Sequence, residues 1–188
     1  MLVIQHRANL PYAKAYTDVA EIDVQIDNRG NVVVGHNPDG VFFEAEVFLK
    51  HSRFKRFFID IKQNLPVGHL MKIMRTFDNR SIGLFDVPMP SAFFLDRAGV
   101  NFYSRVSDVE PVINSLTNRY WVDPLCVWSA PMYEAIASQI VNKQNAIVAC
   151  PSLHGQDIEK CKEVWSWLKE DGRLQGIVTK HPREFNSL

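Results

Sequence analysis

Imidazoles and carboxylates are concentrated in the first third of this chain, at spacings that suit proton transfer beside a bound cation. His6 follows a short apolar run, and Glu21 and Asp23 are separated by a single residue. His36 comes thirteen residues after Asp23, and Asp60 adds a third carboxylate further along. Carboxylate oxygens are the ligands that Mg²⁺ and Ca²⁺ prefer, and histidine gives or takes a proton near neutral pH. These residue types suit metal-assisted cleavage of a phosphodiester.

The pair Glu21 and Asp23 lies in segment 20–26, which has the composition of a β-strand. Alternate side chains of a strand share one face and are about 6.6 Å apart along it, so both carboxylates can converge on one cation. Two like charges on an inward face repel, so a bound cation or a lysine is expected beside them. Asp60 and Lys62 repeat the same spacing on a later strand. The alternative is the solvent-facing polar side of an edge strand.

A turn after this strand explains how His36 can reach the carboxylates. Segment 28–31 reads Asn-Arg-Gly-Asn, which is typical of a tight turn, and three valines follow at 32–34. A hairpin at this point would fold His36 back towards Glu21 and Asp23.

The elements that must position these groups alternate between strands and helices. Apolar or β-branched runs predict eight strands, at 2–6, 20–26, 57–62, 81–87, 100–106, 119–122, 145–150 and 176–179. Helical spacing of apolar residues predicts helices over 65–77, 131–142 and 156–170. This alternation favours a TIM-like (β/α)₈ barrel over an open doubly wound sheet. At 188 residues the chain is shorter than the ~250 typical of that fold, so several helices should be short or missing.

The composition of the chain limits the binding partners and the cellular compartment that we expect. The 188 residues predict a single domain, 1–188, and a net charge of zero argues against nucleic-acid binding. The three cysteines have no metal-ligand spacing, and their odd number indicates free thiols and a cytoplasmic protein. We expect no signal peptide and no membrane span, because no apolar run approaches ~20 residues. The oligomeric state is not indicated.

Four segments together resemble a known enzyme family. They are His6-Arg7, Glu21-x-Asp23-Val24, the hairpin end Val33–His36, and Phe58–Lys62. The pattern is similar to the glycerophosphodiester phosphodiesterases, part of the phosphatidylinositol-phospholipase-C-like superfamily, and the chain looks like a compact, divergent member. The last strand, 176–179, also resembles that family. The specific likeness covers about residues 1–65 and 175–182.

The resemblance implies a TIM barrel, a divalent cation and a small phosphodiester as substrate. By this likeness, Glu21, Asp23 and Asp60 bind the metal, Mg²⁺ or Ca²⁺. His6 and His36 act as general acid and base. Arg7 and Lys62 bind the phosphate of the substrate.

Several positions depart from the family pattern, and they concern the substrate more than the catalytic set. Ala8 stands where the family has glycine, Asp60 where it has glutamate, and Lys180 where it has aspartate. The family's Pro-Glu-Asn-Thr segment is absent, and the stretch between His6 and Glu21 is compressed.

Two further residues are candidate substrate contacts on position alone. Arg105 shares a strand face with Tyr103, and His154 follows the predicted strand 145–150.

The function expected from the catalytic residues and the resemblance is metal-dependent hydrolysis of a glycerophosphodiester-like compound. The alternatives are a non-catalytic barrel relative that binds a ligand, and a lyase that forms a cyclic phosphate; a metal-dependent aldolase or isomerase is a more distant third.

Overall fold

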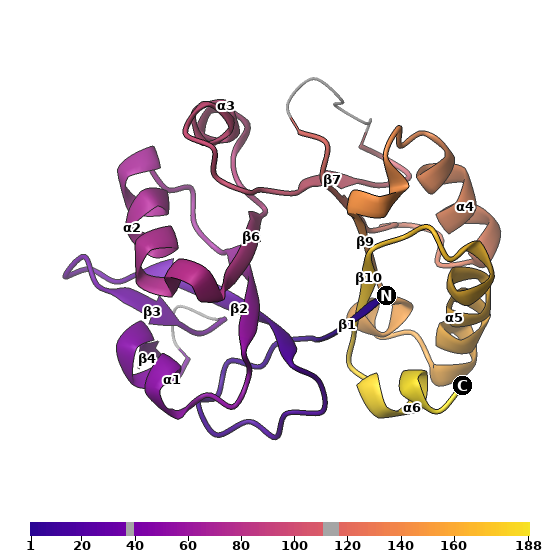
Figure 1. Ribbon diagram of the computed structural model, residues 1–188, viewed down its shortest axis with the longest axis horizontal. Helices are drawn as coiled ribbons and strands as arrows, with labels where there is room; N and C mark the ends of the chain where they lie inside the picture. The colour runs from indigo at the N-terminus through magenta and orange to yellow at the C-terminus, as the bar shows by residue number, and fades with distance from the viewer. Residues whose placement is uncertain (37–39, 111–116) are drawn as a thin grey trace. The chain divides into compact units, whose positions relative to one another are not determined.

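The computed structural model describes residues 1–36, 40–110 and 117–188, in an α/β architecture (Figure 1). The described residues divide into two compact units. The first consists of Met1–His6 with Tyr103–Leu188, and the second of Arg7–Phe102. The expectation of one domain over 1–188 stays a prediction.

The first unit contains a parallel sheet in the order β1-β10-β9-β8-β7. Its strands are β1 (Leu2–Gln5), β7 (Ser104–Val106), β8 (Tyr120–Val122), β9 (Ala146–Ala149) and β10 (Gly176–Thr179). Gly176 lies opposite Leu2, and a Cβ atom there would come within 2.5 Å of the Leu2 carbonyl oxygen. Because all five strands run in one direction, the residues that follow them gather at one edge of the sheet.

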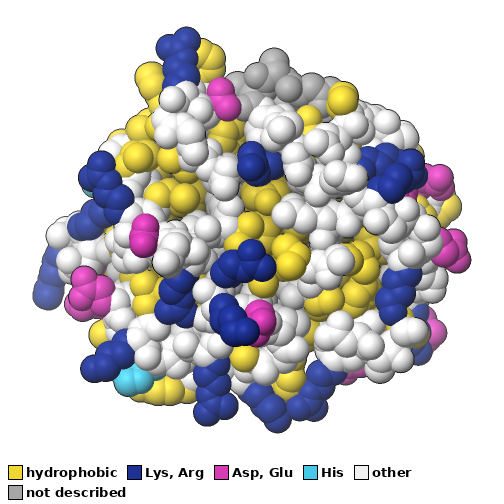
Figure 2. Space-filling model, in the orientation of Figure 1, with side chains coloured by type: hydrophobic (Ala, Val, Ile, Leu, Met, Phe, Trp, Pro, Cys, Tyr) yellow, Lys and Arg dark blue, Asp and Glu magenta, His cyan; other side chains and the backbone are white. Residues whose placement is uncertain are grey.

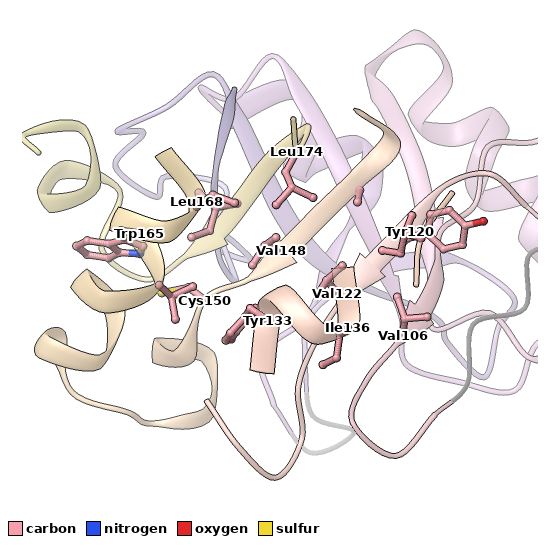
Figure 3. Close-up of a cluster of buried hydrophobic side chains, with 14 of the residues drawn as sticks. Val106, Tyr120, Val122, Tyr133, Ile136, Val148, Cys150, Trp165, Leu168 and Leu174 are labelled. Carbon is pink, nitrogen blue, oxygen red and sulfur yellow. The ribbon is translucent and has the colours of Figure 1, made fainter. Parts of the chain in front are cut away.

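Helices cover one face of this sheet and enclose its core (Figure 3). They are α4 (Ala130–Ser138), α5 (Ile158–Asp171) and α6 (Pro182–Asn186), with short 3₁₀ turns at Lys143–Asn145 and Pro151–His154. Trp165 of α5 is fully buried and meets the Phe185 ring edge-on at 5.6 Å. Burying such a side chain contributes on the order of 2–3 kcal/mol. Asp157 caps α5 by accepting a hydrogen bond from the Lys160 backbone N–H at 3.0 Å.

The second unit combines parallel strands with an antiparallel hairpin. Its strands are β2 (Val19–Ile26), β3 (Val32–Val34), β4 (Phe43–Glu44), β5 (Arg56–Ile61) and β6 (Ser81–Phe85). Strands β2, β5 and β6 pair in parallel, while β3 pairs antiparallel with both β2 and β4. The helices are α1 (Ala45–His51), α2 (Val67–Phe77) and α3 (Met89–Arg97), with a 3₁₀ turn at Asp78–Arg80. All eight residues of β2 are buried, so its polar side chains lie inside the protein.

Most of the predicted elements are present. All eight predicted strands and the hairpin at 28–34 are found, and helices 65–77 and 156–170 correspond to α2 and α5. The predicted helix 131–142 ends earlier, at Ser138, because a tighter turn follows in which the Ile140 N–H bonds to the Ala137 carbonyl. Helices α1 and α6, of seven and five residues, are too short to show a helical period in the sequence. Short helices are what the length of the chain predicts.

Lys and Arg side chains are scattered over the face drawn in Figure 2, with Asp and Glu side chains among them. Among the helices built from described residues, none has the length and apolar character needed to cross a bilayer.

Candidate metal and catalytic site

Three buried carboxylates meet where β2 and β5 run side by side. The parallel register places Asp23 directly opposite Asp60, and Glu21 shares the face of Asp23 two residues earlier. Glu21 and Asp23 are fully buried, and Asp60 is 5% exposed. One carboxylate oxygen from each residue lies within 4.8 Å of the other two. The predicted convergence of the three acids is therefore what the strand pairing produces.

Lys62 supplies part of the positive charge that this cluster needs. Its Nζ lies 3.2 Å from Asp23 Oδ1 and forms an ion pair with Asp60 Oδ2. Burial alone would lower the pKa of Lys62, but Asp60 and Asp23 outweigh that effect and raise it. The lysine is therefore held as an ammonium ion. Even with the Arg7 guanidinium, whose Nε lies 3.9 Å from Asp23 Oδ2, two positive charges face three carboxylates, and an excess of negative charge remains.

The pKa values of the three acids depart from their ordinary values, and burial is the largest single influence on each. Burial raises the pKa of Glu21 well above its ordinary value, and the charges of Asp23 and Asp60 add to the rise. Burial also raises the pKa of Asp60 to about 7, although Lys62 acts in the opposite direction. For Asp23, burial is outweighed by the hydrogen bond from Asn9 and by Lys62, so its pKa is lowered. The site accommodates three negative charges only if more positive charge is added.

A hard divalent cation fits this donor set. Among the described residues, Asp60 Oδ1 is buried and accepts no hydrogen bond. Two oxygens on opposite sides of an ion of this class are about 4–5 Å apart, which matches the separation of the carboxylates. Carboxylate oxygens are ligands that hard divalent cations take. Glu21, Asp23 and Asp60 are the residues that could hold such an ion.

The turn at residues 7–9 anchors the cluster from the outside. The backbone N–H of Arg7 donates to Glu21 Oε2 at 2.7 Å, and the N–H of Ala8 donates to the Glu21 carbonyl at 3.0 Å. Arg7 has a φ of 48°, in the left-handed region that non-glycine residues rarely adopt. Its Nε lies 3.9 Å from Asp23 Oδ2, and the side chain is 46% exposed. Arg7 therefore combines a fixed backbone with a guanidinium that remains accessible.

Asn9 holds Asp23 in place, and it is absent from the residues predicted from the sequence. Its Nδ2 donates to Asp23 Oδ2 at 2.5 Å, and its Oδ1 accepts from the Asp23 backbone N–H at 2.9 Å. The side-chain amide thus binds both the carboxylate and the main chain of one metal-ligand candidate. The signal available in the sequence was a hydrogen-bonding residue three positions after His6, in the compressed stretch between His6 and Glu21.

The hairpin brings His36 to the same carboxylate, as predicted. Gly35 N–H donates to the Asp23 carbonyl at 2.9 Å, and His36 Nδ1 lies 3.3 Å from Asp23 Oδ1. The buried side-chain amide of Gln25 donates to the carbonyls of Gly35 and His36, at 2.9 and 3.2 Å. His36 is 35% exposed at its side chain. Asn37, the next residue, lies outside the described residues.

The remaining predicted site residues belong to the first unit. His6 follows β1, and its N–H donates to the Thr179 carbonyl at 3.0 Å. Arg105 on β7 forms an ion pair with Glu110, with Nε 3.2 Å from the carboxylate. His154 Nε2 lies 2.6 Å from Asp123 Oδ1, and the Trp128 ring stacks on the imidazole at 5.3 Å.

Two acidic residues at strand ends were also not predicted from the sequence as site residues. Asp123 directly follows β8 and is the partner of His154. Asp86 directly follows β6, has a φ of 55°, and is one of the charges that raise the pKa of Asp60. The signal was an aspartate near the end of a predicted strand, inside segment 81–87 for Asp86 and directly after segment 119–122 for Asp123.

Replacement of Asn9 tests its role as the anchor of Asp23. Asn9→Ala would leave a buried N–H and a buried carboxylate oxygen without their partner, so the free energy of unfolding should fall by about 1–3 kcal/mol. Urea denaturation measures this change. The control is Asn64→Ala, at an exposed position, which should change it by less than about 0.5 kcal/mol. Equal stability of the two variants would contradict the anchoring role.

No protein-family model matches the chain, and no curated protein sequence matches it significantly. Solved structures do match. A glycerophosphoryl diester phosphodiesterase from Parabacteroides distasonis superposes with a TM-score of 0.65 at 15% identity, over 99% of this chain and 85% of the other. A glycerophosphodiester phosphodiesterase from Agrobacterium tumefaciens gives 0.62 at 12% identity, over 100% and 99%. One from Thermotoga maritima gives 0.54 at 14% identity, over 99% and 97%.

This likeness agrees with the resemblance found in the sequence and extends along the whole chain. It favours the TIM-like barrel over the doubly wound sheet, and it confirms the predicted fold class. At 10–15% identity, a structural match is evidence for a shared fold and not for a shared activity. The chain therefore has the fold of glycerophosphodiester phosphodiesterases, as a divergent and compact variant.

Proposed function

We propose that this protein is a metal-dependent phosphodiesterase that hydrolyses a small, glycerophosphodiester-like compound. The observation that supports the proposal is the buried cluster of Glu21, Asp23 and Asp60. His36 lies beside it, with Nδ1 3.3 Å from Asp23 Oδ1. A chain gains no stability from burying three carboxylates together. The likeness of the fold to phosphodiesterases adds support to the same function.

The three carboxylates would hold Mg²⁺ or Ca²⁺ in this reaction. A cation bound there would supply positive charge opposite the charge that develops on the phosphoryl oxygens. Arg7, whose guanidinium is half-exposed beside Asp23, is placed to bind a phosphate oxygen. Lys62 would hold Asp23 and Asp60 in position and add a second positive charge near the phosphate.

The histidines would move the protons. Because His36 Nδ1 faces Asp23, its Nε2 is left for exchange of a proton with the substrate or the attacking water. The carboxylate would fix the ring orientation, as in other histidine–carboxylate pairs. We assign the second proton transfer to His6, at the end of β1. One imidazole would remove a proton from the attacking oxygen and the other would protonate the leaving oxygen.

A soluble diester is the substrate we expect. General-acid assistance acts on an ester leaving oxygen, so phosphomonoesters should react poorly. Arg105 and His154 remain candidates for contacts with the substrate. The three cysteines are free thiols, two of them buried, which suits a reducing compartment, and we propose the cytoplasm.

Removal of metal tests the reaction itself. Protein treated with EDTA should lose the release of glycerol phosphate from glycerophosphodiesters, and Mg²⁺, Mn²⁺ or Ca²⁺ should restore it. Added metal should also raise the melting temperature, since a ligand at 100 times its Kd stabilises the fold by about 2.7 kcal/mol. Asp23→Asn should abolish both effects, whereas Asp18→Asn, at an exposed ion pair with Lys55, should keep them.

Undiminished hydrolysis by the metal-free protein would sink the metal assignment. Hydrolysis of p-nitrophenyl phosphate alone would exclude a phosphodiesterase. A stable cyclic phosphate in the ³¹P NMR spectrum would identify the lyase alternative, and metal binding without turnover of any diester would identify the non-catalytic one.

Replacement of the histidines tests their roles. His36→Ala and His6→Ala should each lower kcat by about 10²–10⁴, the usual scale for general acid–base catalysis. The double variant should lose less than the product of the two, because residues that act in one step are not additive. His69→Ala, at an exposed position of α2, should stay within about twofold of the wild type. An active His36→Ala would remove that residue from the mechanism.

A further inference from the structure

A basic surface lies at the amino-terminal edge of the sheet in the second unit. Its main part is segment 50–56, which reads Lys-His-Ser-Arg-Phe-Lys-Arg and contains five basic residues and no acidic one. All five basic side chains are exposed, whereas Phe54 among them is buried. Lys and Arg side chains are visible along the lower edge of Figure 2, where Figure 1 draws α1 and the loop before β2. Because the chain as a whole has no net charge, this concentration of positive charge is local.

The backbone of segment 50–56 is fixed by an arginine from another part of the chain. The Arg80 guanidinium donates to the carbonyls of Leu49, at 2.9 Å, and of Phe54. Its Nε donates to the carbonyl of Lys55 at 3.4 Å, and the guanidinium lies over the Phe57 ring, 4.9 Å from the centroid. Arg80 is therefore used by the fold, and it presents the basic side chains of the segment from a defined backbone.

Three of these basic side chains have no acidic partner. Lys55 does pair with Asp18, with Nζ 2.9 Å from the carboxylate. Across the part of the chain that the structure describes, Lys50, Arg53 and Arg56 form no ion pair. Lys50 lies in the last turn of α1, where a positive charge stabilises the helix, but Arg53 and Arg56 lie beyond it. The stability of α1 therefore does not account for this charge.

Apolar and aromatic side chains border the basic segment. The loop before β2 lies along it, since the Lys55 N–H donates to the Asp18 carbonyl at 2.8 Å. In this loop Leu10 is 59% exposed and Tyr12 is 72% exposed. The Tyr12 ring lies 5.2 Å from the His51 ring, so apolar and basic side chains are direct neighbours. Exposed apolar and aromatic groups beside Lys and Arg are typical of protein surfaces that lie in the interface of a lipid bilayer.

We propose that this basic surface, formed by segments 10–18 and 50–56, docks the protein on an anionic lipid bilayer. Each Lys or Arg near such a bilayer strengthens binding by about fivefold, so the three unpaired side chains together contribute about 100-fold. Leu10 and Tyr12 would enter the headgroup region and add an apolar contribution. Nucleic acid would attract the same charges, but it has no apolar region for an exposed leucine. The cytoplasmic leaflet carries anionic lipids, which agrees with the proposed location of the protein.

The basic surface and the carboxylate cluster lie at different ends of the same two strands. Val19 of β2 and Arg56 of β5 are paired at the basic end, and Asp23 and Asp60 are paired four residues further on. Four residues of strand span about 13 Å. A bilayer at the basic surface would therefore leave the cluster uncovered. Docking does not depend on the proposed hydrolysis, and either proposal can fail without the other.

Cosedimentation with lipid vesicles tests the docking surface. The protein should bind vesicles that contain about one-third phosphatidylglycerol about 100-fold more tightly than vesicles of phosphatidylcholine alone. This preference should largely disappear at about 1 M salt, where exposed charges are screened. Equal binding to the two kinds of vesicle, or no binding to either, would overturn the proposal.

Charge-removing variants locate the surface. Affinity for the anionic vesicles should fall about 100-fold in the triple variant Lys50→Gln, Arg53→Gln, Arg56→Gln. The matched control removes the same charge from exposed positions of α5 and should stay within about twofold of the wild type; it is Lys160→Gln, Lys162→Gln, Lys169→Gln. Equal losses in the two triple variants would overturn the proposal, because binding would then follow net charge and not this surface. Unchanged melting temperatures would show that both variants are folded.

Replacement of Leu10 distinguishes a bilayer from another polyanion. Leu10→Ser should weaken binding to the anionic vesicles by about tenfold, because it removes apolar surface that the bilayer would bury. An unchanged vesicle affinity in Leu10→Ser would overturn the proposal. Tighter binding of a single-stranded oligonucleotide than of anionic vesicles would also overturn it, in favour of nucleic acid as the partner.

Discussion

Three carboxylates buried side by side on β2 and β5 are the constraint to which the surrounding structure is adapted. Desolvation and mutual repulsion both oppose their ionisation, and these effects raise the pKa of Glu21 and Asp60. Parallel pairing fixes Asp23 opposite Asp60, so the strands cannot separate the charges. The protein must therefore bring positive charge and hydrogen-bond donors to this point. The chain itself supplies two positive charges, those of Lys62 and of the partly exposed Arg7.

The donors come from two segments of the second unit. The turn after β1 delivers the N–H of Arg7 and the amide of Asn9, and the hairpin delivers His36. A non-glycine residue in the left-handed region, Arg7, is tolerated there, at a cost of about 1–3 kcal/mol. Strain of this size at a turn that binds Glu21 indicates that its position serves the site rather than the stability of the fold. The same hairpin also lines the cavity beside Gln25.

The sequence was most informative where chemistry and strand periodicity coincide. The alternation of Glu21 and Asp23 predicts a shared face, and the turn at 28–31 predicts the hairpin; both follow from local geometry and are observed. Residues whose role depends on tertiary contacts could not be found in this way. Asn9 lies in a loop without periodicity, and it acts on Asp23 fourteen positions away. Asp123 likewise gains its partner His154 only when β8 and β9 pair.

A crystal of the protein soaked in Mn²⁺ would test the central claim most directly, by the position of the anomalous difference peak. The account predicts one strong peak about 2.0–2.4 Å from carboxylate oxygens of Glu21, Asp23 and Asp60. Lys62 would then contact the outer oxygens of Asp23 and Asp60. A peak elsewhere, or an empty cluster with Lys62 still bridging these two aspartates at saturating Mn²⁺, would show that the protein's own cations, Lys62 and Arg7, balance the charge. The site would then not be a metal centre.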